Sequence, residues 1–185
     1  MKIYVLRHEE RGANPLPLTP LTPGGFVNSL SLIKKIYSVN PDIIYCSPFL
    51  RTIETIYPYC KFYNKKVRIE NSLYEYVHAP EFKYSNYIHR PIDLNKNAYQ
   101  KLMTTCIDDT YESALDVYDI PFPEIEEKLM SRVHKFIYKI TNNKKYKNKN
   151  ILLVTHMSTV NAIKSYISPT DLEEPYEMGR IEQIL

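Results

Sequence analysis

Short apolar runs alternate along the chain with longer segments in which apolar residues recur at helical spacing. The short runs, at residues 3–6, 43–46, 67–69 and 151–154, are rich in β-branched and aromatic residues and predict buried strands. The helical spacing covers residues 26–36, 49–59, 123–140 and 158–167. Strands that alternate with helices predict an α/β fold, a three-layer α/β/α sandwich with a mainly parallel central sheet. Residues 176–185 are a candidate for a further edge strand.

Local signals predict where two of these helices begin. Ser47 and Pro48 have the residue types of an N-cap and a first helical position, so Arg51 falls in the first turn of the second helix. From there its side chain can reach the end of the first strand. Ser158 or Thr159 can cap the last helix. The proline-rich stretch 15–23 predicts a connection without helix, because each proline removes an amide donor.

One region has no sustained period. Residues 77–122 contain Pro, Asn, Asp and Tyr without regular spacing, and we expect an inserted cap of loops and short helices there. The basic polar run 142–150 is typical of a solvated loop. No repeat and no domain boundary is evident, so residues 1–185 are expected to form one domain.

Composition narrows the class of protein. Lys and Arg total 24 and Asp and Glu 21, and this net charge of +3 is too small to indicate nucleic acid or a membrane surface as partner. No apolar run approaches the ~20 residues of a spanning helix. Three widely spaced cysteines favour reduced thiols over disulfides or a zinc site. We therefore expect a cytoplasmic protein, with its oligomeric state left open.

Candidate chemistry lies at two strand ends. Arg7 and His8 follow the first strand, and His156 follows the fourth. Ligands of open α/β sheets bind beyond the carboxyl ends of the strands. An arginine fork beside a largely neutral imidazole suits a phosphoryl group. Taken singly, an arginine in such a place is more often a surface residue, and a histidine is more often a hydrogen-bonded residue of the core.

Four separated motifs and one shorter pattern strengthen this interpretation because they occur in a fixed order. The shorter pattern is Leu73-Tyr74-Glu75, between the third and fourth motifs. The four motifs are Arg7-His8-Glu9-Glu10 with Asn14, Leu21-Thr22-Pro23-Gly24-Gly25, Ser47-Pro48-Phe49-Leu50-Arg51-Thr52-Ile53-Glu54-Thr55, and Leu153-Val154-Thr155-His156.

This ordered set resembles the histidine phosphatase superfamily (phosphoglycerate mutase-like), branch 1. The resemblance implies a histidine acid phosphatase-type phosphomonoester hydrolase that forms a phosphohistidine on His8. It implies that Arg7, Arg51 and His156 hold the phosphoryl oxygens. A hydrogen bond from Asn14 is also expected. Neither a metal nor another cofactor is needed, and the substrate is a phosphorylated small molecule or a phosphoprotein.

The resemblance also implies that Glu75 protonates the leaving oxygen. That role requires a protonated carboxyl, so burial or a neighbouring carboxylate is expected to raise the pKa of Glu75. Three carboxylates of the predicted cap stay open as alternative donors: Asp108, Asp109 and Glu112.

Two departures from the family pattern keep a second class of function open. Glu9 and Met157 stand where glycine usually follows each histidine, and Glu9 would repel a phosphate if it faced the pocket. A catalytically inactive phosphate-binding or interaction module is therefore an alternative. Within the enzyme class, the Leu-Tyr-Glu-Tyr sequence at 73–76 resembles that of the family's protein tyrosine phosphatases. A phosphoglycerate mutase-like enzyme would use the same histidine.

Overall fold

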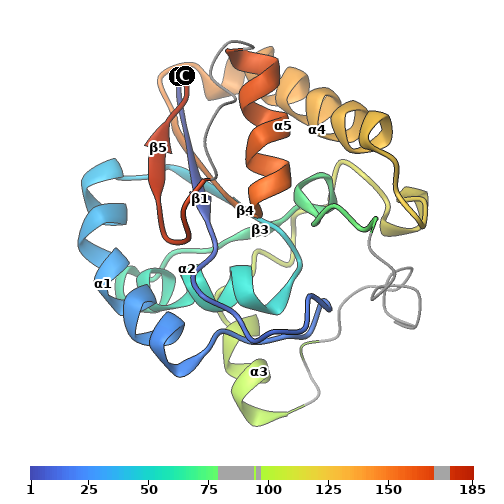
Figure 1. Ribbon diagram of the computed structural model, residues 1–185. Helices are drawn as coiled ribbons and strands as arrows, with labels where there is room; N and C mark the ends of the chain where they lie inside the picture. The colour runs from blue at the N-terminus through green and yellow to red at the C-terminus, as the bar shows by residue number, and fades with distance from the viewer. Residues whose placement is uncertain (79–93, 95–96, 169–175) are drawn as a thin grey trace.

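The computed structural model describes residues 1–78, 94, 97–168 and 176–185. Its sheet has the strand order β3-β2-β4-β1-β5 (Figure 1). All neighbouring strands pair in parallel except β5, which runs antiparallel to β1. The predicted α/β fold with a mainly parallel sheet is confirmed, and the C-terminal segment supplies the edge strand. The strands are β1 (Lys2–Arg7), β2 (Ile43–Cys46), β3 (Arg68–Ile69), β4 (Asn150–Thr155) and β5 (Ile181–Gln183).

Helices cover both faces of the sheet. The principal helices of the described residues are α1 (Pro23–Val39), α2 (Leu50–Tyr63), α3 (Ala98–Thr104), α4 (Glu126–Thr141) and α5 (Met157–Ile167). Because side chains alternate along a strand, Ile3 and Val5 pack against α4 and α5, whereas Leu6 packs against α1 and α2. The result is the predicted three-layer sandwich (Figure 1).

The predicted helix starts were wrong at two places. α2 begins at Leu50, with Phe49 and not Ser47 at the N-cap. The Ser47 hydroxyl lies 2.8 Å from the ring of His156, and its bond from a backbone amide, that of Phe49, is long at 3.4 Å. α5 begins at Met157 with His156 at its N-cap, ahead of the expected Ser158 or Thr159. The Thr159 hydroxyl donates to the Tyr74 carbonyl. In both places, a hydroxyl that the local sequence predicts as a helix cap makes a tertiary hydrogen bond.

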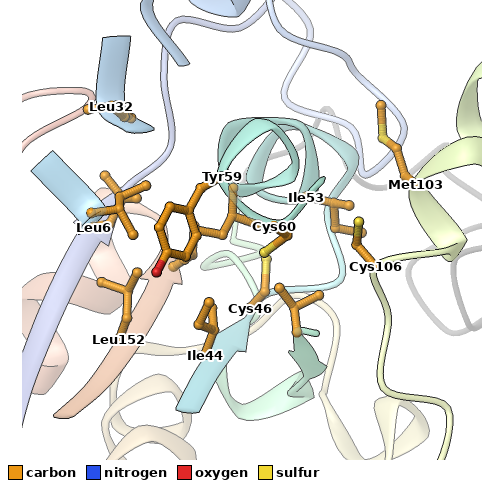
Figure 2. Close-up of a cluster of buried hydrophobic side chains, with 14 of the residues drawn as sticks. Leu6, Leu32, Ile44, Cys46, Ile53, Tyr59, Cys60, Met103, Cys106 and Leu152 are labelled. Atoms are coloured by element: carbon orange, nitrogen blue, oxygen red, sulfur yellow. The ribbon is translucent and has the colours of Figure 1, made fainter. Parts of the chain in front are cut away.

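Part of the expected cap region contributes to the core. Met103 of α3 and the following Cys106 lie in the same buried cluster as Ile53 and Cys60 of α2 (Figure 2). The short helix η4 (Val117–Asp119) lies further along. Within the predicted cap, residues 79–93 and 95–96 lie outside the described part of the chain. All three cysteines are free and buried.

The register of β1 and β4 places their ends side by side. Arg7 pairs with Thr155, so His8 and His156 leave adjacent parallel strands at the same level. The edge of the sheet where β1, β2 and β4 end is therefore the place to look for a site.

Among the described helices, none combines the length and apolar character that crossing a membrane would demand.

Candidate active site

One ring nitrogen of His8 makes a hydrogen bond, and the other makes none with the described residues. Its Nδ1 lies 2.7 Å from the carbonyl oxygen of Glu9. A carbonyl only accepts, so Nδ1 carries the proton and Nε2 keeps its lone pair. Burial, together with the nearby His156 and Arg51, lowers the pKa of His8 to about 2. His8 is thus a neutral imidazole with a free Nε2, the form that a nucleophile requires.

His156 is fully buried and has a side-chain oxygen near each ring nitrogen, but its Nδ1 makes no hydrogen bond within the described part of the chain. Its Nε2 lies 2.8 Å from the Ser47 hydroxyl, and its Nδ1 lies 3.3 Å from Oε2 of Glu75. Its ring also packs edge-on against Phe49, with centroids 4.8 Å apart. Burial, followed by the charge of Arg51, lowers the pKa of His156 to about 4, although Glu75 opposes this shift. The ring is therefore neutral, with Nδ1–H directed at the carboxylate.

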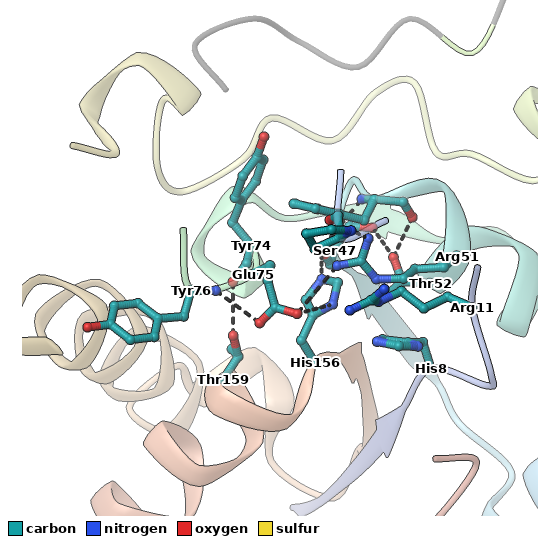
Figure 3. Close-up of polar contacts among 12 residues, drawn as sticks. His8, Arg11, Ser47, Arg51, Thr52, Tyr74, Glu75, Tyr76, His156 and Thr159 are labelled. Atoms are coloured by element: carbon teal, nitrogen blue, oxygen red, sulfur yellow. Dashed lines mark hydrogen bonds and ion pairs between the residues drawn. The ribbon is translucent and has the colours of Figure 1, made fainter. Parts of the chain in front are cut away.

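Glu75 links the two motifs that supply His156 and Arg51. Its Oε2 lies 3.3 Å from Nη2 of Arg51 and 3.3 Å from His156, while Oε1 accepts from the Tyr76 amide (Figure 3). Burial alone would raise the pKa of Glu75, but His156 and Arg51 outweigh it and the pKa is lowered. The expected raised pKa is therefore wrong, because the carboxylate faces a cation and an imidazole N–H.

Arginine side chains make the site cationic. Arg51 is fully buried, and its Nη1 donates to the carbonyls of Pro15 and Leu16. Arg7 donates to the carbonyl of Tyr176. The Nε–H groups of both Arg7 and Arg51 are buried without a partner in the described part of the chain. Buried donors normally have hydrogen-bond partners, so these two N–H groups can still donate to a bound anion.

A cavity of about 270 Å³ opens over these groups. Arg51 and His156 are not among the described lining residues, but both contact Glu75, which does line the cavity. Its lining residues are Arg7, His8, Arg11, Pro15, Glu75, Tyr76, His78, Met157 and Ser158.

Sequence reasoning missed two contributors to this site. Arg11 lines the cavity and adds a third guanidinium, and its Nη1 donates to the carbonyls of Gly12 and Ala13. Its place four residues after Arg7 in the first motif was the available signal. Ser47 orients His156, a function that its capping pattern concealed.

The other predicted residues lie elsewhere. Asn14 is exposed, does not line the cavity, and its side chain accepts from the Leu16 amide. Of the alternative proton donors, Asp108 pairs with Arg68. Asp109 and Glu112 are exposed and are not among the described residues lining the cavity.

Glu9, one of the two departures, faces away from the cavity. Its carboxyl fills the space beside Gly179, where a Cβ would lie 2.0 Å from Oε1. Gly179 also has a positive φ of 68°, which favours glycine. Burial raises the pKa of Glu9, against the opposing hydrogen bonds from Asn28 and the Glu10 backbone. Glu9 therefore does not point its charge at an anion in the cavity, whereas Met157 lies on the cavity wall.

The residue set favours an anion over a cation. His8, Glu75 and His156 offer ligand atoms within 4.8 Å of one another, a grouping that could hold a metal ion by distance alone. The arginines around them would repel a divalent cation. Guanidinium groups, an imidazole N–H and a free imidazole Nε2 instead suit the oxygens and the phosphorus of a phosphoryl group.

Comparisons with known proteins identify the family of the chain. The sequence model of the "Histidine phosphatase superfamily (branch 1)" matches residues 3–181. No curated protein matches the chain.

Solved structures of low sequence identity share the fold. The ecdysone phosphate phosphatase of Bombix mori, in complex with tungstate, has a TM-score of 0.64 at 19% identity, covering 97% of this chain and 83% of that one. The alpha-ribazole phosphatase of Shigella flexneri has a TM-score of 0.66 at 19% identity, covering 99% and 89%. A phosphoserine phosphatase of Entamoeba histolytica has a TM-score of 0.63 at 19% identity, covering 98% and 89%.

Proposed function

Because the chain belongs to the histidine phosphatase superfamily (branch 1), we propose that it is a phosphomonoesterase that forms a phosphohistidine on His8. The observation that carries this proposal is the state of His8, whose Nδ1 donates to the Glu9 carbonyl while Nε2 is unprotonated in a cavity lined by guanidinium groups. The finer assignment is a histidine acid phosphatase-type hydrolase that uses no metal.

In the first step, Nε2 of His8 attacks phosphorus in line with the ester oxygen. The N–P bond forms as the P–O bond to the leaving group breaks. Arg7, Arg51 and His156 hold the non-bridging oxygens and stabilise the charge that they share in the transition state. The Glu9 carbonyl accepts from Nδ1–H throughout and so stabilises the positive ring of the phosphohistidine.

Glu75 is the proposed proton donor, and the substrate itself supplies the proton. A phosphomonoester has a second pKa of about 6, so a fraction of it arrives as the monoanion. Its negative charge beside Glu75 raises the pKa of that carboxyl, which His156 and Arg51 otherwise lower, and the proton moves to Glu75. Glu75 then protonates the leaving oxygen, and later accepts a proton from the water that hydrolyses the phosphohistidine.

Turnover of p-nitrophenyl phosphate in the presence of EDTA tests the proposal. We expect metal-independent hydrolysis, and acid-labile phosphate on the peptide that contains His8 after rapid quenching in alkali. His8→Ala should abolish both signals. His134→Ala is the matched control, because His134 lies between α4 and α5 and bonds to the Ala162 carbonyl and the Ser165 hydroxyl. Lack of turnover by the wild-type protein would favour a phosphate-binding module instead.

The substrate class that we propose first is a phosphorylated small molecule, as the names of the structural neighbours suggest. One observation favours phosphotyrosine as a second candidate. Tyr76 and His78 stack on each other with centroids 4.2 Å apart and both line the cavity, where they would offer a flat surface to an aromatic leaving group. Comparing kcat/KM for phosphotyrosine and phosphoserine separates the two candidates.

A further inference from the structure

Side chains bond to the backbone carbonyls of the segment that carries Glu75. It leaves the short helix η1 (Asn71–Leu73) and crosses the ends of β4 and α5 without joining the sheet. Each of its carbonyls from Ser72 to Glu75 nevertheless accepts a hydrogen bond. Thr155 donates to Leu73 at 2.8 Å, and Thr159 donates to Tyr74 at 2.9 Å. The remaining donors come from one residue, Arg132 of α4.

Arg132 bonds to three carbonyls of this segment. Its Nη1 donates to Ser72 at 2.7 Å, and its Nη2 donates to Tyr74 at 3.0 Å and to Glu75 at 3.1 Å. A guanidinium has five donors in one rigid plane, whereas an ammonium has a single donor centre. The fork therefore fixes the segment on both sides of Tyr74.

Glu124 holds this guanidinium in place. Its Oε1 accepts from Nε of Arg132 at 2.7 Å and its Oε2 from Nη2 at 3.0 Å. The side chains are only 5% (Arg132) and 0% (Glu124) exposed, so the pair is almost completely removed from water. The Glu124 amide donates to the Val77 carbonyl. The residue that holds Arg132 therefore also holds the chain just beyond Glu75.

A buried ion pair of this kind is poorly explained by stability alone, since its desolvation often costs as much as the attraction returns. Its geometry has a clear consequence for the site. Glu75 reaches Arg51 and His156 at 3.3 Å from a backbone whose Tyr74 and Glu75 carbonyls are both bonded to Arg132. A shift of about 1 Å in a reacting group can cost on the order of 100-fold in rate.

We propose that Arg132, held by Glu124, is a positioning residue that keeps the Glu75 carboxyl in place for proton transfer to the leaving group. This proposal rests on the proposed phosphatase function. It assigns no contact with substrate to Arg132, whose donors are used by Ser72, Tyr74, Glu75 and Glu124.

A misplaced proton donor slows substrates with poor leaving groups selectively, whereas a general loss of structure slows all substrates. Phenyl phosphate has a poor leaving group that needs protonation, whereas p-nitrophenolate leaves readily without it. Loss of positioning should lower kcat/KM for phenyl phosphate by about 10- to 100-fold, a part of the roughly 10²- to 10⁴-fold that a general acid contributes. It should change kcat/KM for p-nitrophenyl phosphate by less than about 3-fold. KM should stay close to the wild-type value because the phosphate-binding arginines are untouched.

The test uses Arg132→Met combined with Glu124→Leu, so that no unpaired charge is left buried, and Arg132→Lys as a second variant that keeps the charge opposite Glu124. Each is measured with both substrates, alone and together with Glu75→Gln. The matched control is Arg68→Met with Asp108→Leu, which removes another arginine–carboxylate pair, 3.2 Å apart, that holds no part of the Glu75 segment. Thermal unfolding identifies folded variants.

The expected result is a selective loss with phenyl phosphate that disappears when Glu75 is already Gln, because two changes acting through one group are not additive. The control pair should show neither effect. Equal losses with both substrates, or full additivity with Glu75→Gln, would overturn the positioning role while leaving the phosphatase proposal intact. If the wild-type protein has no turnover and forms no phosphohistidine, the proposed function fails first, and the role of Arg132 fails with it.

Discussion

The ends of β1 and β4 present the same sequence pattern in two different environments. Each strand delivers a histidine, and the two rings lie with centroids 5.2 Å apart at 63°. His8 has one nitrogen bonded to a carbonyl and the other free, whereas both nitrogens of His156 face side-chain partners, Ser47 and Glu75. The difference teaches that surrounding groups, and not the strand-end histidine itself, decide which ring can attack and which can only orient and donate.

The largest expected effect comes from exchanging the two rings for amides. His8→Gln removes the proposed nucleophile and should lower kcat by at least about 10⁴-fold, as loss of a nucleophile does elsewhere. His156→Gln removes a donor to the phosphoryl group and should cost about 10²–10³-fold. Steady-state kinetics and mass spectrometry of the His8 peptide check this. Equal losses, or phosphate trapped on neither variant, would remove the proposed difference between the rings.

Acid should destabilise the fold through both histidines. Burial lowers the pKa of each below 6.5, so the unfolded chain binds protons that the folded protein does not, and stability falls as pH drops below 6.5. The loss of stability from His156 levels off near pH 4, whereas the loss from His8 continues toward pH 2. Each shift should contribute on the order of 3 kcal/mol of lost stability at pH 4.

Urea unfolding at pH 7 and pH 4 measures this effect in the wild-type protein and in the two glutamine variants. Each variant should lose less stability than the wild type between the two pH values. Ser38→Ala, on the exposed part of α1, serves as the control and should retain the wild-type dependence. An unchanged difference in His8→Gln would mean that His8 titrates as an ordinary surface histidine.

A smaller effect is expected from Ser47→Ala. Without this hydroxyl, which lies 2.8 Å away, Nε2 of buried His156 has no hydrogen-bond partner among the described residues, as is already the case for Nε2 of His8. Loss of one orienting hydrogen bond should reduce kcat/KM by about 10-fold. Ser38→Ala, on the exposed part of α1, is the matched control. Activity at the wild-type level in Ser47→Ala would show that Glu75 and Phe49 suffice to orient the ring.

The smallest effect is expected at Glu9. Its side chain faces Gly179, so Glu9→Gln should change kcat and KM by less than about 3-fold, as is usual for a group that makes no contact with the reacting atoms. The pKa of Glu9 is raised, so the carboxylate weakens stability as pH rises above its ordinary value of 4.5. The glutamine variant should then be at least as stable as the wild type at pH 7 in urea unfolding. A large gain in activity would instead place the Glu9 charge near the phosphate.

Some site residues could have been found from sequence and others could not. Arg132 shares one face of α4 with the buried Leu129, Val133 and Phe136, and a charged residue inside such a stripe signals a buried partner. That signal does not name the partner, because Glu124 and the Ser72 carbonyl are joined to it only by folding. The pKa of Glu75 was predicted in the wrong direction for the same reason, since Arg51 and His156 are distant in sequence.

The sequence by itself determined the strands, the order of the motifs and the delivery of both histidines to one sheet edge. These features follow from side-chain periodicity and backbone preference, which act over a few residues. Only the tertiary structure decided which ring nitrogen stays free, where Glu9 points and which groups surround Glu75. Hydrogen bonding and desolvation depend on atoms brought together from distant parts of the chain, and no local pattern specifies those neighbours.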